Sequence, residues 1–171
     1  MILGMSIETF TTVHTVITLI AIASSFIVMF GMLASKKLPG WTAFCLLFTV
    51  LTSVTGFIFP IHEFTPALGV GALSLVLLAL ALYGLYAKHL AGAWRWIYVV
   101  TAVVAFWFNF FVLIVQSFEK VKLLNPAAPI VGPPFAGATN TQFAIAQAVA
   151  LLFFVVVGFL AARKFHPAPE L

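Results

Sequence analysis

Charged residues are scarce in this sequence. Only 7% of its 171 residues are charged and 64% are hydrophobic, whereas a soluble domain carries about 25% charged residues. These few charged residues cannot cover a surface that faces water. We therefore expect lipid to surround most of the chain. The length corresponds to one domain, which we expect to cover residues 1–171.

Aspartate and catalytic motifs are also missing. The chain has no Asp, no Gly-x-Ser-x-Gly elbow, no P-loop and no dinucleotide fingerprint. These absences remove the support for serine-type catalysis and for nucleotide binding. Because no other motif indicates a reaction, a non-enzymatic function is the leading prediction.

The single cysteine and the small positive charge narrow the choice further. Cys45 excludes an intrachain disulfide, and its apolar surroundings predict a small buried side chain. The formal net charge of +4 comes from Lys and Arg in short connections. We therefore predict that they orient helices and that the protein has no nucleic-acid partner.

Five apolar stretches are each long enough for a transmembrane helix, which takes about 20 residues. They cover residues 10–34, 41–59, 67–87, 96–117 and 141–162. Ser6 stands where a helix cap is expected before the first stretch. That stretch is too long, and lacks the basic start, for a cleaved signal peptide. The predicted fold is an all-α integral membrane protein, a bundle of five transmembrane helices.

The connections and their charges predict the topology. The first three are short, which favours antiparallel neighbours, whereas the long loop 118–140 holds four prolines within residues 125–134 and is expected to be functional or mobile. Six Lys or Arg flank one side of the bundle and two the other, which places the N-terminus outside and the C-terminus in the cytoplasm. We predict a multi-pass protein of a bacterial inner (plasma) membrane. The six basic residues are Lys36, Lys37, Lys88, Arg95, Arg163 and Lys164.

Polar side chains recur at a similar depth in all five stretches, in the half nearer the outer side. Because such residues are costly in lipid, they should face the interior of the bundle. Their helical spacing predicts an outer-leaflet polar pocket open to the extracytoplasmic side. The predicted ligand-binding residues are His14, Thr18, Thr52, Asn109, Gln116 and Gln147.

Other interpretations explain these residues without a ligand. Ser and Thr are ordinary contacts between transmembrane helices. A hydrogen bond between Asn109 and Gln147 would account for both amides equally well. His14 would then be a neutral buried histidine bonded to a neighbouring hydroxyl.

Two kinds of ligand fit the predicted pocket. The first is a small apolar molecule such as a quinone, sterol, isoprenoid or membrane lipid, since such sites are aromatic-lined with few polar groups. The aromatic run 106–111 around Asn109 would line it or face lipid. The second is haem or a transition metal, held by His14 with His62 and Glu63, in a redox protein.

Two broader alternatives remain open. The chain is also typical of an accessory or structural subunit of a larger membrane complex. Coupled transport by a monomer is disfavoured because no stretch carries Asp, Glu, Lys or Arg at its centre. A homo-oligomer would weaken that objection.

Overall fold

A computed structural model describes residues 1–60, 66–121, 124 and 141–167. Within these ranges the fold is all-helical, with no strand. Five of its helices are long and apolar enough to cross a membrane. A short π-helix, η1, continues α3. In chain order the elements are α1 (Ile7–Leu33), α2 (Pro39–Gly56), α3 (Pro66–Leu82), η1 (Tyr83–Ala87), α4 (Trp94–Lys120) and α5 (Thr141–Lys164).

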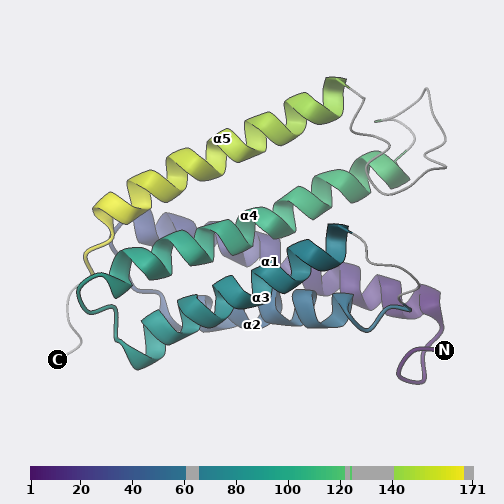
Figure 1. The fold of residues 1–171 in the computed structure, drawn as a ribbon, viewed down its shortest axis with the longest axis horizontal. Helices are drawn as coiled ribbons and strands as arrows, with labels where there is room; N and C mark the ends of the chain where they lie inside the picture. Colours follow the sequence, from purple (N-terminus) through teal and green to yellow (C-terminus); the bar gives the residue numbers. More distant parts are fainter. Residues whose placement is uncertain (61–65, 122–123, 125–140, 168–171) are drawn as a thin grey trace.

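The helices form an elongated antiparallel bundle, as Figure 1 shows. Each helix packs against its neighbour in sequence, and α1 also contacts α4 and α5. The outer end of the bundle is defined here as the end where α1, α3 and α5 begin. The basic end is the opposite one, where α2 and α4 begin. The short first connections bring about the antiparallel order, as predicted.

The first helix begins where its cap predicts. The Ser6 hydroxyl accepts a hydrogen bond of 3.1 Å from the backbone N–H of Thr9, and Glu8 lies in the first turn. An N-cap hydroxyl satisfies an amide that has no partner in the helix, and an acidic residue there favours the helix dipole. The prediction of a cap at Ser6 is confirmed.

The core lies between α4 and the surrounding helices, towards the basic end. Small residues of α4 let its neighbours approach closely: Val99, Ala102 and Ala105 are fully buried. Cys45 is also fully buried, as predicted. On α5, a Cβ at Gly158 would lie 3.2 Å from Cγ1 of Val103, so glycine allows α5 to lie close to α4.

The π-helix at the end of α3 was not predicted. Within it, Gly84 faces α4, and a Cβ there would lie 3.3 Å from the carbonyl oxygen of Trp94. Tyr83 packs edge-on against the same Trp94, with ring centroids 5.0 Å apart. The wider turn thus fits the end of α3 against the start of α4. The connection then reverses through three residues with positive φ, which are His89, Leu90 and Gly92.

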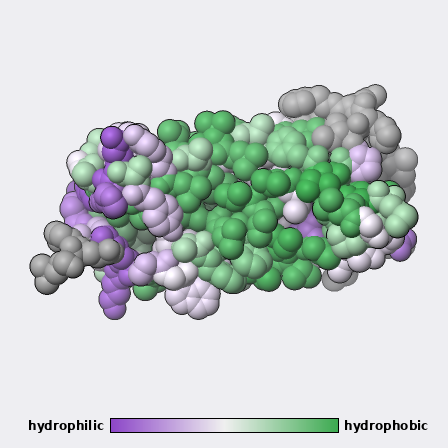
Figure 2. Space-filling model, turned by 90° about the horizontal axis from the view of Figure 1, so that it is seen from below, coloured by the Kyte–Doolittle hydropathy of each residue, from purple (hydrophilic) through white to green (hydrophobic). Residues whose placement is uncertain are grey.

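The surface carries a broad apolar belt. Figure 2 shows hydrophobic side chains across the middle of the molecule and hydrophilic ones towards its ends. Large apolar side chains such as Leu152, Val155 and Phe159 on α5 are more than half exposed. Soluble monomers rarely expose apolar patches of this extent. The belt has the distribution that contact with lipid requires.

Most helix boundaries differ from the predicted ones by one to three residues. α2 occupies Pro39–Gly56 rather than 41–59, because Pro39 begins it at the favoured first position. α4 continues to Lys120, beyond the predicted end at 117, and α5 reaches Lys164. Most of the predicted loop 118–140 lies outside the described residues.

Candidate functional site

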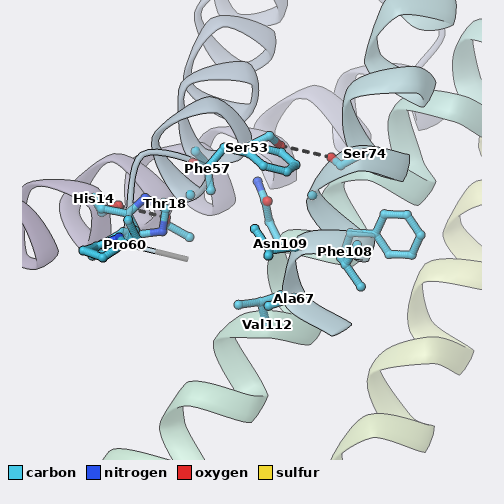
Figure 3. A pocket seen from close by; sticks show the side chains of 16 residues that line it. His14, Thr18, Ser53, Phe57, Pro60, Ala67, Ser74, Phe108, Asn109 and Val112 are labelled. Atoms are coloured by element: carbon cyan, nitrogen blue, oxygen red, sulfur yellow. Dashed lines mark hydrogen bonds between the residues drawn. The ribbon is translucent and has the colours of Figure 1, made fainter. Parts of the chain in front are cut away.

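A cavity of about 530 Å³ opens between α1, α2, α3 and α4 in the outer half of the bundle. Its wall is mostly apolar, with aromatic rings from the end of α2 and from α4. Figure 3 shows how residues of the four helices surround it. The lining residues are His14, Thr18, Thr52, Ser53, Gly56, Phe57, Phe59, Pro60, Ala67, Leu68, Val70, Gly71, Ser74, Phe108, Asn109 and Val112.

α1 contributes His14 and Thr18, which are four residues apart and therefore share a face. Nδ1 of His14 lies 2.7 Å from the hydroxyl oxygen of Thr55 on α2. The imidazole also packs edge-on against Phe59, with centroids 5.3 Å apart. The ring is thus held from one nitrogen and one edge while it lines the cavity.

The threonine hydroxyl groups of the wall already use their protons within the protein. Thr18 donates to the carbonyl of His14 at 2.9 Å, and Thr52 donates to the carbonyl of Phe48 at 2.9 Å. Such bonds to the preceding turn are the usual way to satisfy a hydroxyl inside a helix. The lone pairs of these oxygens remain as acceptors.

Ser53 and Ser74 connect α2 with α3 beside the cavity. The Ser53 hydroxyl lies within donating distance of the Thr49 carbonyl, at 3.2 Å, and of the Ser74 hydroxyl, at 3.3 Å. Both serines are buried. This contact is a structural one of the kind expected between membrane helices.

Asn109 is the exception among the polar lining residues. It is only 7% exposed, and its amide makes no hydrogen bond to any part of the chain that the structure describes. Figure 3 shows the side chain reaching from α4 towards Ser53 and Phe57. Unlike Nε1 of Trp107 and Oε1 of Gln147, its polar atoms are not fully enclosed, so they face the cavity. An amide that is left unpaired away from water costs about 1–3 kcal/mol. The cavity therefore contains one amide that lacks a protein partner.

Four of the six predicted ligand-binding residues meet at this cavity. They are His14, Thr18, Thr52 and Asn109. Gln116 and Gln147 do not line it. Gln116 donates to the carboxylate of Glu119 at 3.1 Å, nearer the outer end. The alternative bond between Asn109 and Gln147 is not present.

Gln147 belongs instead to the contact between α4 and α5. Its Nε2 donates to the carbonyl of Phe111 at 3.2 Å, while its buried Oε1 has no partner in the described structure. The buried indole N–H of Trp107, one turn before Phe111, lacks a partner too. These two groups stand outside the cavity.

Sequence patterns missed the residues that shape the apolar wall. Gly71 of α3 is one of them: a Cβ there would lie 3.2 Å from the ring of Phe57. Phe108 lines the cavity, whereas Phe106 of the same run is buried in the core. The available signal for Gly71 was a glycine near the start of the third apolar stretch, shortly after the aromatic residues that end the second.

The proposed metal ligands are only partly visible. His14 lies at the cavity, and His62 and Glu63 lie outside the described residues. Among the residues that are described, no three His, Cys, Asp or Glu gather into a group that would hold a metal ion.

A second cavity of about 440 Å³ lies at the basic end, between α1, α2, α4 and η1. Lys36, Lys37 and His89 line it together with Tyr86 and Tyr98. It is separate from the predicted polar residues of the outer half.

Comparisons with known proteins add no family. No protein-family model, no curated protein and no solved structure matches this chain. The function must therefore be argued from the site.

Proposed function

We propose that this protein is a multi-pass membrane protein that binds a small, largely apolar molecule in the cavity of its outer half. The ligand class is that of quinones, isoprenoids and other apolar molecules with a polar end. His14, Thr18, Thr52 and Asn109 would supply the polar contacts.

The unpartnered amide of Asn109 is the observation that supports binding most strongly. It lies in a cavity whose volume of about 530 Å³ falls in the range of about 300–1,000 Å³ usual for ligand sites. A mostly apolar wall with a few polar groups is also typical of them. A ligand that bonds to the amide would remove the cost of leaving it unpaired.

The position of the cavity supports access from the membrane or from the outer side. It lies where α2 ends and α3 begins, next to the apolar belt. The six basic residues that define the predicted cytoplasmic side flank the other end of the bundle. With the N-terminus outside, the cavity would lie in the outer leaflet of a bacterial inner membrane.

A test begins with the purified protein in detergent. Native mass spectrometry of the wild-type protein should detect a retained apolar molecule, and the Asn109→Leu variant should retain much less of it. Thr101→Val is a matched control, because Thr101 is also on α4 and also 7% exposed but donates to the Ile97 carbonyl at 2.7 Å. Equal retention by all three proteins would refute the assignment of this cavity.

One observation favours a second candidate, a haem- or metal-binding redox protein. Nε2 of His14 makes no hydrogen bond to the described residues, and a neutral imidazole nitrogen is a common metal ligand. An absorption spectrum and metal analysis of the purified protein distinguish the two functions. A Soret band or a bound transition metal that disappears in His14→Phe would favour the redox function.

A further inference from the structure

The hydrogen bond between His14 and Thr55 fixes where the imidazole proton lies. The Thr55 hydroxyl has a single proton, and its oxygen lies 2.6 Å from the carbonyl oxygen of Leu51. A carbonyl can only accept, so the hydroxyl donates to Leu51. In the 2.7 Å contact with His14, the Thr55 oxygen must therefore be the acceptor, and Nδ1 of His14 carries the proton.

The hydrogen-bonding role of the second ring nitrogen, Nε2, follows from this assignment. In a neutral imidazole with a proton on Nδ1, Nε2 bears a lone pair and acts as an acceptor. Within the described ranges no group donates to Nε2, and His14 lines the cavity. The cavity thus presents a hydrogen-bond acceptor at its α1 wall and the Asn109 amide at its α4 wall.

Charge restricts the ligand further. None of the described residues that line the cavity carries a formal charge besides the titratable His14. No lining residue would pair directly with an ionised carboxylate, phosphate or ammonium group. Lys120, whose charge acts on His14, is exposed and lies outside the lining, and burying an unpaired charge is costly. The polar end of the ligand is therefore neutral.

We infer that the ligand of this cavity is an apolar alcohol or phenol whose hydroxyl group donates a hydrogen bond to Nε2 of His14. This inference rests on the proposed function, since it names the chemistry of the ligand at the same site. The Asn109 amide, which can donate and accept, binds a polar atom of the same molecule. A ligand whose polar groups only accept would leave Nε2 without a partner.

Two nearly isosteric probes test the hydroxyl. 4-Hexylphenol donates a hydrogen bond, whereas 1-fluoro-4-hexylbenzene does not. Their affinities are measured by calorimetry for the wild type and for His14→Phe, which keeps an aromatic ring beside Phe59. The ratio of the two affinities, compared between the proteins, cancels the different partitioning of the probes into detergent. The advantage of the phenol is the ratio of its affinity to that of the fluoro probe. This ratio should be about fivefold smaller for His14→Phe than for the wild type, which corresponds to the loss of one hydrogen bond.

Thr55→Val tests the proton position separately. It removes the acceptor from Nδ1, so the ring is free to place its proton on Nε2, and the advantage of the phenol should fall. Thr101→Val, outside the cavity, should leave the advantage unchanged. ¹⁵N NMR of the wild-type protein checks the tautomer directly, with the His14 signals identified by their absence in His14→Phe. They should show Nδ1 protonated and Nε2 unprotonated.

The outcomes separate this inference from the proposed function. If both probes bind equally well to all variants of His14 and Thr55 but bind weakly to Asn109→Leu, the cavity is a binding site and the hydroxyl inference is wrong. An NMR spectrum with the proton of neutral His14 on Nε2 also overturns it. If neither probe binds and no apolar molecule co-purifies, the proposed function fails.

Discussion

Asn109→Leu should make the ligand-free protein more stable and abolish its stabilisation by ligand. Asn109 is 7% exposed and has no hydrogen-bond partner among the described residues. Replacing an unpaired buried amide with an apolar group of similar size removes a desolvation cost of about 1–3 kcal/mol. The adjoining cavity of about 530 Å³ accommodates the leucine, so no overpacking opposes the gain.

The expected gain in the free energy of unfolding is near the lower limit, at about 1 kcal/mol, because the amide borders a cavity that water can enter. For a protein of this size it corresponds to about 2–4 °C in the melting temperature. Thermal unfolding in detergent, after removal of bound lipid, measures it. A probe at 100 times its Kd should stabilise the wild type by about 2.7 kcal/mol and Asn109→Leu far less.

Thr101→Val is the control for this measurement. Thr101 has the same exposed fraction on the same helix, but its hydroxyl is satisfied within α4. Its replacement should change stability by less than about 0.5 kcal/mol. If Asn109→Leu destabilises the ligand-free protein by 1 kcal/mol or more while the control is neutral, the amide has a partner in the folded protein. That outcome would refute an unpaired amide at Asn109.

Four further predictions follow from other contacts. A double-mutant cycle of His14→Phe and Thr55→Val, measured by thermal unfolding, should give a coupling of about 0.6 kcal/mol and not more than about 1.7; zero coupling would contradict the bond between α1 and α2. Gly158→Leu should destabilise the protein by about 1–3 kcal/mol because the side chain collides with Val103, and an unchanged melting temperature would contradict that packing. Arg95→Ala should make the chain after α5 more sensitive to protease, since Arg95 donates to the Phe165 carbonyl at 2.7 Å; an identical digestion pattern would count against this role. A reporter fused to the N-terminus should be active only outside the cytoplasm, and a cytoplasmic signal would refute the orientation.

The number and type of the helices could be predicted because lipid imposes a simple rule. Every backbone group must be paired inside the segment, so an apolar run of about 20 residues is read as a helix. The first and last residues of the helices were harder to predict from the sequence. α4 extends beyond the apolar run to Lys120, and the backbone N–H of Val121 still donates to the carbonyl of Ser117. The π-helix at Tyr83–Ala87 depends on the fit of Gly84 against Trp94, a contact that no local pattern encodes.

The candidate site could be predicted for α1, α2 and part of α4 but not for α5. Depth and helical spacing identify the face on which a polar residue lies. They do not identify which helix that face meets. α4 packs between α3 and α5, so Asn109 turns to the cavity whereas Gln147 of α5 contacts the backbone at Phe111 on another side of α4. Gln116, two turns beyond Asn109, is too near the outer end to reach the cavity.

The cavity lies at the end of the bundle where the two shorter helices, α2 and α3, are connected. α1 and α4 have 27 residues each, whereas α2 and α3 have 18 and 17. At 1.5 Å per residue the long helices exceed the short ones by about 14 Å. At the basic end, η1 extends α3 and fills part of this difference. At the outer end, α2 stops at Gly56, Pro60 follows, and α3 begins only at Pro66. The last turns of α2 and the first turns of α3 form the wall of the cavity at this end, opposite His14 of α1 and Asn109 of α4.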